Sequence, residues 1–365
     1  MTNYTELWVN RDDFRSTKIA QRENPPLSDG EIRVSIDKFG LTANNVSYAL
    51  TGDMIGYWKA YPVNSEDNEP WGRVPAWGCA DVIESNCDDI AVGERLWGFF
   101  PMASHAVLKA GKVKPERFLD ISEHRRALAT LYNTYRRTDA EPELVKQFEN
   151  ERCLFLPSLG TSFIVYDYLV DNHLFGAEQV LIGSASSKTG FGVAKMLRSD
   201  ANVDPKLVGI TSPGNRDFVE GLGCFDQVVL YGEEDQIDAS KPTAYIDMSG
   251  DVRLTTAVHK HVGENVVCSS LVGASHWEQG GEVGELPGAE PTFFFAPTQF
   301  AKRQKEWGES VLMMKAMQTS FAVAADIKKL MSIEWINDPK TLQKTWLDLL
   351  DNRVPASRGL MVSLA

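Results

Sequence analysis

The stretch QVLIGSASSKTGFGVAKMLR at residues 179–198 decides the fold of this chain. It starts with a short apolar run over 180–182, which predicts a strand, and continues with small residues over 183–190, which predict a tight turn. Apolar residues at helical spacing over 192–197 then predict a helix. A strand, a small-residue turn and a helix in this order are typical of the start of a dinucleotide-binding βαβ unit.

The predicted helix offers a site for an anion. Its first backbone N–H groups have no partner within the helix, and the helix dipole favours negative charge there. Small residues let a pyrophosphate approach the backbone, and hydroxyl and ammonium groups add charge-assisted hydrogen bonds. The cofactor-binding candidates in the turn are Ser184, Ser186, Ser187, Lys188, Thr189 and Gly190. The strict G-x-G-x-x-G pattern is absent, so an ordinary strand–helix junction stays open as the alternative.

The end of the next strand indicates which dinucleotide is bound. Residues 207–210, LVGI, predict that strand. An acidic residue at its end would accept hydrogen bonds from the ribose hydroxyls and favour NAD. Here Ser212, Asn215 and Arg216 follow the strand, and these donors suit a 2′-phosphate. We therefore expect NADPH as the cofactor.

Three further apolar runs complete the predicted sheet, at residues 227–231, 244–248 and 266–271. Each run ends in a cofactor-binding candidate, and these are Tyr231, Ser249 and Val272 in that order. Short strands that alternate with helical stretches predict an α/β fold with a doubly wound parallel sheet.

The order of these motifs resembles the cofactor domain of medium-chain dehydrogenase/reductases. The motifs are VLIGSASSKTGFGVAKML, VGITSPGNRDFVEGLGCFDQVVLYG and YIDMSGD, and the closest branch is the zinc-free quinone oxidoreductases and enoyl reductases. More narrowly, SASSKTG, LTANNVSYA, LYNTYRR and FFFAP together resemble a bacterial domain of unknown function, DUF2855. The resemblance covers nearly the whole chain. It implies a Rossmann domain plus a GroES-like, β-rich catalytic domain.

The resemblance also implies domain boundaries. We expect the GroES-like domain at 1–155 and 301–365, ending in a strand near 360–364, and the Rossmann NADP-binding domain at 156–300. Residues 293–295 are expected to form a short buried strand in the region that borders the nicotinamide, which makes Phe295 a cofactor-binding candidate. Tyr231 matches a tyrosine that flanks the adenine or the 2′-phosphate in quinone oxidoreductases.

The substrate side lacks the residues that hold zinc in related enzymes. Cys79 and Ala80 stand where those relatives carry a His-Glu pair, and Asn44 and Asn45 stand near their cysteine ligand. Catalytic zinc needs three convergent protein ligands, so we expect no metal. A hydroxyl or an amide must then donate a hydrogen bond to the oxyanion that develops on the substrate. The catalytic candidates are Asn45, Tyr48, Tyr57 and Tyr132, each of which could be structural instead.

Residues 120–152 are expected to form a helical insertion. Its arginines, Arg125, Arg126, Arg136 and Arg137, flank an aromatic segment around Tyr132. One interpretation is a solvated helix pair with aromatic packing. The other is a wall of the substrate pocket whose arginines meet an anionic substrate or the cofactor phosphates.

The composition limits the partners and the compartment. Of the 365 residues, 43% are hydrophobic and 24% are charged, as in a soluble globular protein. A net charge of −13 argues against nucleic acid and anionic membranes. We expect no signal peptide and no membrane span, because the first residues are polar and mixed and no stretch approaches 18 apolar residues. Five scattered cysteines without a C-x-x-C motif fit reduced thiols, so we expect a cytoplasmic protein.

These observations favour an NADPH-dependent, zinc-independent oxidoreductase. It would transfer hydride to a small-molecule carbonyl or activated alkene, such as a quinone, an enone or a 2-enoyl thioester. An NADPH-binding sensor or structural protein without turnover is the alternative, because a cofactor fold is not a reaction. A zinc alcohol dehydrogenase is a third hypothesis, and a homodimer is left open.

Overall fold

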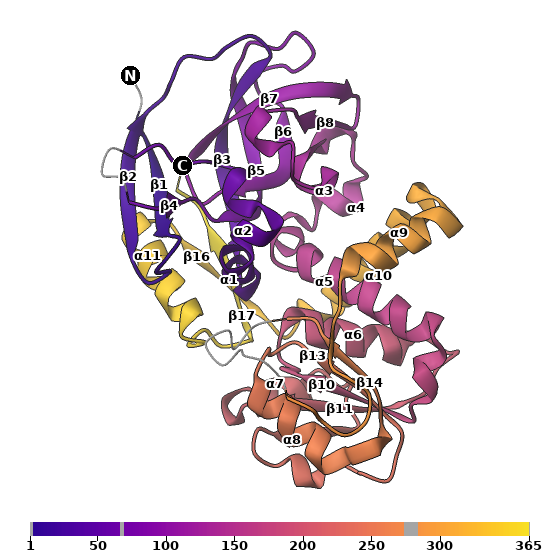
Figure 1. The fold of residues 1–365 in the computed structure, drawn as a ribbon. Coiled ribbons are helices and arrows are strands. Elements are labelled where there is room, and N and C mark those ends of the chain that lie inside the picture. The colour runs from indigo at the N-terminus through magenta and orange to yellow at the C-terminus, as the bar shows by residue number, and fades with distance from the viewer. Residues whose placement is uncertain (1–2, 66–68, 274–283, 365) are drawn as a thin grey trace. The chain divides into compact units, whose positions relative to one another are not determined.

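The computed structural model describes residues 3–65, 69–273 and 284–364, which form two compact units (Figure 1). The first unit comprises Met1–Leu154, Ile333–Val354 and Arg358–Ala365. The second comprises Phe155–Ser332 and Pro355–Ser357.

The second unit is built on a six-stranded parallel sheet. Its strands are β10 (Gln179–Gly183), β11 (Lys206–Thr211), β12 (Gln227–Leu230), β13 (Thr243–Asp247), β14 (Val266–Leu271) and β15 (Thr292–Phe293). They lie in the order β12-β11-β10-β13-β14-β15, which is the strand order of the doubly wound dinucleotide-binding fold. The sequence-based fold class is therefore confirmed.

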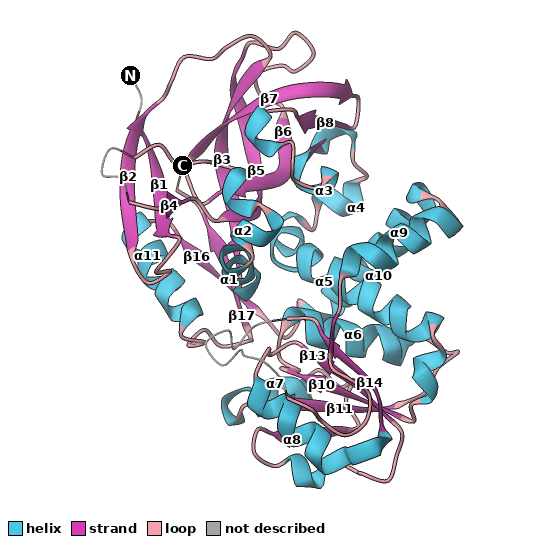
Figure 2. Ribbon diagram, viewed as in Figure 1, coloured by secondary structure: helices cyan, strands magenta, loops and turns pink. Residues whose placement is uncertain are grey.

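Helices cover both faces of this sheet (Figure 2), namely α5 (Glu149–Asp171), α6 (Lys188–Ser199), α7 (Arg216–Gly221) and α8 (Val252–Val262). Because both faces are covered, the central strands are apolar along their length rather than alternating. Leu181, Val208, Ile210 and Tyr245 are fully buried in the core that results.

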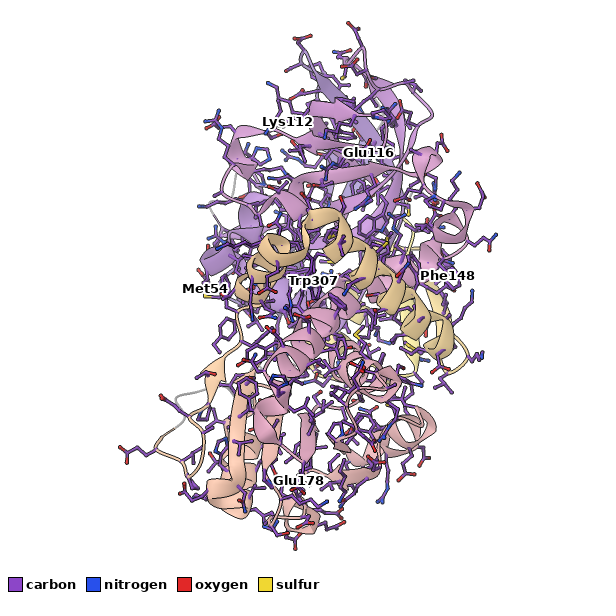
Figure 3. The ribbon with its side chains drawn as sticks, turned by 90° about the vertical axis from the view of Figure 1, so that its right-hand side faces the viewer. Met54, Lys112, Glu116, Phe148, Glu178 and Trp307 are labelled. Atoms are coloured by element: carbon purple, nitrogen blue, oxygen red, sulfur yellow. The ribbon has the colours of Figure 1, made fainter. Side chains whose placement is uncertain are left out.

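Two further helices belong to the second unit, although we expected residues from 301 onward in the first. They are α9 (Ala296–Trp307) and α10 (Glu309–Ile327). Arg303 of α9 forms an ion pair with Asp167 of α5, and Asp326 of α10 pairs with Lys195 of α6. Trp307, labelled in Figure 3, packs between Arg303 and Lys315 and so holds the two helices together.

The expected buried strand at 293–295 is not buried. The strand β15 is only Thr292–Phe293, and it lies at the edge of the sheet. The side chains of Phe293 and Phe295 are 64% and 54% exposed, because no further strand or helix of the described chain covers this edge.

The first unit is β-rich. A three-stranded sheet contains β1 (Asn3–Asn10), β2 (Thr17–Glu23) and β4 (Trp71–Gly72). An eight-stranded sheet contains β3 (Glu31–Leu41), β5 (Pro75–Ser85), β6 (Arg95–Pro101), β7 (His105–Lys114), β8 (Arg117–Asp120), β9 (Thr134–Arg137), β16 (Ser332–Ile336) and β17 (Arg358–Val362). Pairing of β3 with both β5 and β7 closes it into a barrel-like form. The sequence predicts a C-terminal strand near 360–364, and the structure has β17 there, paired with β3. Helices α1 (Ala43–Leu50), α2 (Gly52–Ile55) and α11 (Pro339–Leu350) complete this unit.

The helical insertion expected at 120–152 is wrong. This segment contributes β9 to the barrel and otherwise forms single turns and the short helices α3 (Thr130–Asn133) and α4 (Glu143–Lys146). The cause is Arg125, whose buried guanidinium donates to Asn133 Oδ1 at 3.0 Å and to the carbonyls of Ala60 and Tyr132. A buried arginine must satisfy its donors, and this set of partners folds the segment back on itself.

Helix α5 is apolar enough by length and composition to cross a membrane. This is weak evidence for a membrane span, because a core helix of a globular protein passes the same test. Of its most apolar window, 61% is buried within the structure. The expectation of no membrane partner stays a prediction.

Helices α5 and α6 pack closely because Gly192 has no side chain. A Cβ at this position would lie 2.3 Å from Ser162 Oγ and 2.7 Å from Leu159 Cδ2. We expect Gly192→Ala to lower the free energy of unfolding by about 1–3 kcal/mol, because the two helices must move apart. Urea denaturation measures the change. Gly160→Ala on α5 is the control, since nothing lies within 4 Å of its Cβ, and it should gain about 0.5–1 kcal/mol. An equal effect of both changes would contradict the packing argument.

Candidate functional site

The turn after β10 presents the start of α6 at the carboxyl edge of the sheet. Ser187 caps the helix, and its hydroxyl accepts a hydrogen bond from Gly190 N at 3.1 Å. Ser184 has a left-handed backbone with φ of 54°, which reverses the chain between strand and helix. The first N–H groups of α6, at Lys188 and Thr189, have no carbonyl partner within the helix. This arrangement can hold a phosphate group.

Glycines let segments of the chain pack closely against one another at this edge. A Cβ at Gly190 would lie 2.9 Å from the Ser184 carbonyl oxygen, and one at Gly183 would lie 2.6 Å from Asp247 Oδ1. A Cβ at Gly273, just after β14, would lie 2.5 Å from the Met248 carbonyl oxygen. The backbone segments therefore approach one another more closely than any other residue allows.

The expected 2′-phosphate residues lie together at the end of β11. Asn215 Nδ2 donates to both Ser186 Oγ and Ser212 Oγ, each at 3.2 Å, and so joins the ends of β10 and β11. Arg216 starts α7 and pairs with Glu220 at 2.9 Å, with 47% of its side chain exposed. The cluster carries no acidic side chain at the strand end itself.

Lys188 is a half-buried ammonium at the first turn of α6. Burial lowers its pKa to about 8. Within the described residues it forms no ion pair or hydrogen bond, so its charge is available to an anion.

Two further cofactor candidates, Ser249 and Val272, are hydrogen-bonded to Asp247, which the sequence reasoning missed. Its carboxylate accepts hydrogen bonds from Ser249 Oγ, Ser249 N and Gly250 N at 2.6–3.0 Å. Its carbonyl oxygen accepts from Val272 N at 2.8 Å. Burial raises the pKa of Asp247, and these hydrogen bonds oppose that shift. The Asp-Met-Ser-Gly sequence after a buried strand was a usable signal, because Asp side chains commonly organise such turns.

The last two cofactor candidates, Tyr231 and Phe295, lie beside different strand ends. The Tyr231 hydroxyl is hydrogen-bonded to Ser184, which places this tyrosine against the turn after β10. Phe295 precedes α9, next to Phe294, whose N–H donates to the carbonyl of Leu271 at the end of β14. Both residues thus lie near strand ends of the second unit.

The first unit brings three of the four catalytic candidates into one aromatic cluster. The hydroxyls of Tyr57 and Tyr132 are 2.7 Å apart. Tyr48 lies against Tyr57, with ring centroids 4.8 Å apart. The Tyr48 hydroxyl accepts from Asn44 Nδ2 at 2.7 Å and from Trp77 Nε1 at 3.0 Å, which leaves its own proton to donate. Burial raises the pKa of Tyr48 and Tyr57, so both stay protonated donors at neutral pH.

In Asn45, the fourth candidate, both polar atoms of the side chain are hydrogen-bonded to backbone groups. Its Oδ1 accepts from Thr42 N at 2.7 Å and completes the capping box of α1. Its Nδ2 donates to the Pro75 carbonyl at 2.9 Å. With 2% exposure and these partners, its side chain fixes α1 to β5.

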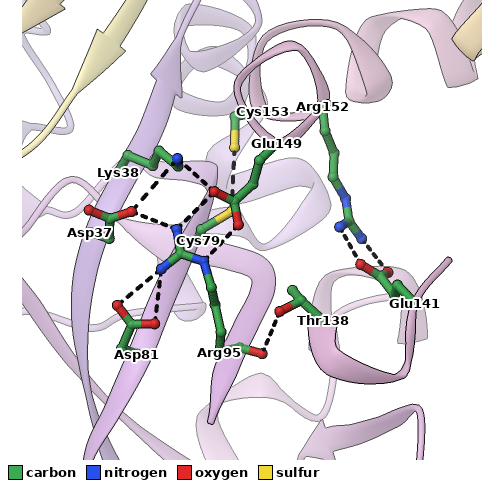
Figure 4. A network of polar contacts seen from close by, with 10 residues as sticks. All are labelled: Asp37, Lys38, Cys79, Asp81, Arg95, Thr138, Glu141, Glu149, Arg152 and Cys153. Atoms are coloured by element: carbon green, nitrogen blue, oxygen red, sulfur yellow. Dashed lines mark hydrogen bonds and ion pairs between the residues drawn. The ribbon is translucent and has the colours of Figure 1, made fainter. Parts of the chain in front are cut away.

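No group of three metal-ligating side chains occurs among the residues that the structure describes. Cys79 stands where zinc-dependent relatives carry a His-Glu pair, and its Sγ lies 4.0 Å from Cys153 Sγ. Beside this pair, Arg95 binds Asp37, Asp81 and Glu149 (Figure 4). Burial would raise the pKa of Glu149, but Arg95 and Lys38 outweigh burial and lower it to about 2. The absence of zinc stays a prediction.

Several solved structures share this fold at low sequence identity. CurA from Vibrio vulnificus, solved with NADPH, matches with a TM-score of 0.58 and 12% identity over 96% of this chain and 94% of its own. A mutant enoyl thioester reductase from Candida tropicalis matches with 0.57 and 12% over 100% of each chain. The quinone oxidoreductase from Coxiella burnetii gives 0.51 and 13%, also over 100% of each.

Sequence comparison assigns the family. No sequence among the curated proteins matches this chain. The family model described as a protein of unknown function, DUF2855, matches residues 39–355, which include both the tyrosine cluster of the first unit and the serine turn of the second. The chain therefore belongs to the DUF2855 family, with the fold of quinone and enoyl reductases.

Proposed function

We propose that this protein is an NADPH-dependent oxidoreductase that reduces an activated alkene or carbonyl compound. The observation that carries the proposal is the carboxyl edge of the parallel sheet, where the start of α6 and the Ser186–Ser212–Asn215 cluster converge. The structural match to CurA, which was solved with NADPH, supports the choice of cofactor. The matches to an enoyl thioester reductase and a quinone oxidoreductase support the reaction class.

The second unit has the groups that a dinucleotide needs. Gly183, Gly190 and Gly273 let the loops at this edge pack closely, and the first N–H groups of α6 bind the pyrophosphate. Lys188 adds a positive charge there, and Ser212, Asn215 and Arg216 bind the 2′-phosphate. When bound, NADPH supplies the hydride.

The first unit supplies the hydrogen-bond donors. The Tyr48 hydroxyl, with its proton free to donate, holds the carbonyl oxygen of the substrate. The Tyr57–Tyr132 pair offers a second donor beside it. Donation to an oxygen whose negative charge grows during reaction lowers the barrier, because the bond strengthens in the transition state.

The reaction is tested by NADPH oxidation with a panel of quinones, enones and 2-enoyl thioesters. We expect turnover with at least one class, and Tyr48→Phe should lower kcat by about a hundredfold while NADPH affinity stays unchanged. Tyr61→Phe is the matched control, because it removes another buried hydroxyl, one that is hydrogen-bonded to Tyr135 and to the Phe99 carbonyl. Tight NADPH binding without turnover on the whole panel would instead indicate a sensor or structural protein.

Arg216 should give the protein a preference for NADPH over NADH. We expect Arg216→Ala to weaken NADPH binding about tenfold and to leave NADH binding unchanged, since the arginine is half-exposed and shared with Glu220. Glu220→Gln is the control, because it removes the competing carboxylate and should not weaken NADPH binding. Titration of both cofactors against the three proteins measures this. Equal losses for NADPH and NADH would show that Arg216 does not read the 2′-phosphate.

Lys188 should make NADPH binding depend on pH. With its pKa lowered to about 8 by burial, the ammonium is charged at pH 7 and mostly neutral at pH 9. A phosphate binds the charged form, so the affinity should fall by up to about tenfold between these pH values. The second pKa of the 2′-phosphate is about 6, so this group is already largely doubly ionised throughout this pH range. In Lys188→Arg the dependence should disappear, because the guanidinium stays charged. An unchanged pH profile in this variant would assign the titration to another group.

A further inference from the structure

Arg136 differs from nearby arginines of the first unit because no carboxylate forms an ion pair with it in the part of the chain that the structure describes. Arg95 is surrounded by three carboxylates, Arg137 pairs with Glu94, and Arg125 lies 3.4 Å from Asp120. Arg136 is half-buried, yet it has no ion pair or hydrogen bond within the described chain. Its five N–H donors therefore have no protein partner, and none of them is among the buried atoms without a partner, so they are open to solvent or to a ligand.

Strand pairing shows what lies beside Arg136. It is directly opposite Trp97 of β6 on one side and Arg117 of β8 on the other. Opposite residues of paired strands point to the same face of the sheet, so these three side chains share one face. Arg137, the next residue along β9, points to the other face.

The same face carries further unmatched donors. Arg152 lies over the Trp97 ring at 4.2 Å, and its two terminal nitrogens are held by Glu141 at 2.5 and 2.6 Å (Figure 4). Its Nε and the Nε1 of Trp97 are buried, and neither has a partner in the structure. Burial lowers the pKa of Arg136, and so does the charge of Arg152 and Arg117, whereas Glu141 and Glu116 oppose the shift. The face thus has an excess of positive charge and of donors.

Aromatic rings connect this face with the tyrosine cluster. Trp97 stacks on Trp77 with ring centroids 4.7 Å apart. Trp77 in turn donates to the Tyr48 hydroxyl and lies 6.2 Å from the Tyr132 ring. The two tryptophans, which are 5% and 8% exposed, therefore form a buried link between the tyrosine cluster and the face that carries Arg136.

We propose that Arg136 is the anchor of an oxyanion subsite that binds a carboxylate or a phosphate at the end of the substrate remote from the reacting group. This inference rests on the proposed reductase function, and it deepens it by naming a substrate class. The substrate carries an apolar or aromatic segment between its reacting group and its oxyanion. The guanidinium binds that oxyanion with its planar pair of donors, as arginine does with carboxylates and phosphates.

The test compares an acid with its neutral isostere. The probes are the enone chalcone-4-carboxylic acid and its primary carboxamide, titrated calorimetrically into the full-length protein without NADPH. We expect the acid to bind at least about tenfold more tightly than the amide, and inorganic phosphate to compete with it. Arg136→Ala should bind both probes equally, and Arg136→Lys should keep part of the preference because it keeps the charge but not the fork.

Arg137→Ala is the matched control, since it removes a neighbouring arginine from the opposite face and should keep the preference. Thermal melting of each variant shows whether it is folded. The proposal is overturned if the wild-type protein fails to bind the acid or prefers it no more than the amide. It is equally overturned if the preference survives in Arg136→Ala. Because the readout is binding without NADPH, failure of the reductase function would appear separately, as absence of NADPH binding or oxidation.

Discussion

The nucleotide edge of the second unit depends on one buried carboxylate, that of Asp247. It is fully buried at the end of β13, where an unpaired charge would be very costly. The loop that follows wraps its N–H and hydroxyl donors around the carboxylate, and the chain after β14 donates to the Asp247 carbonyl. One residue thereby fixes the loops after two strands. It also explains Gly183, because any side chain there would collide with the carboxylate.

The two units provide different kinds of chemistry by different physical means. In the second unit the candidate site is made largely of backbone: a helix N-terminus, glycines without side chains, and short hydroxyl side chains. Such a site is rigid and suits a phosphate, which is recognised by position and charge. In the first unit the candidate site is made of large side chains that bond one another, such as the Tyr57–Tyr132 pair. A site of this kind is specific for the shape and polarity of a substrate.

The sequence predicted the second unit well because its signals are local. The carboxyl ends of parallel strands must meet at one edge, so the convergence of Ser186, Ser212 and Asn215 followed from the strand assignment alone. Features that depend on distant contacts were not predicted. Residues 120–152 read as helical because the partners of Arg125, such as the Ala60 carbonyl, lie far away in the chain. The exposure of Phe293 and the packing of α10 on α6 likewise depend on which elements become neighbours.

Asn45 shows a further limit of sequence reasoning. Its position near the zinc-ligand region of related enzymes suggested chemistry, but a capping box uses the same residue types that a polar pocket would use. Only the partners distinguish the two roles: Asn45 bonds backbone on both sides, whereas Tyr48 keeps a proton to donate.

The protonation of the tyrosines bears on the substrate of the proposed reductase. Burial raises the pKa of Tyr48 and Tyr57, so they act as neutral donors rather than as charged groups. A neutral hydrogen bond stabilises an anion less than a full positive charge does. It is therefore best matched to a transition state whose charge is spread over several atoms, as in the enolate formed when an enone or a 2-enoyl thioester accepts hydride. Reduction of a simple ketone concentrates the charge on one alkoxide oxygen and demands more from the same donors. The tyrosine cluster thus favours an activated alkene within the proposed class, and the stacked tryptophans beside it favour one that is conjugated and flat.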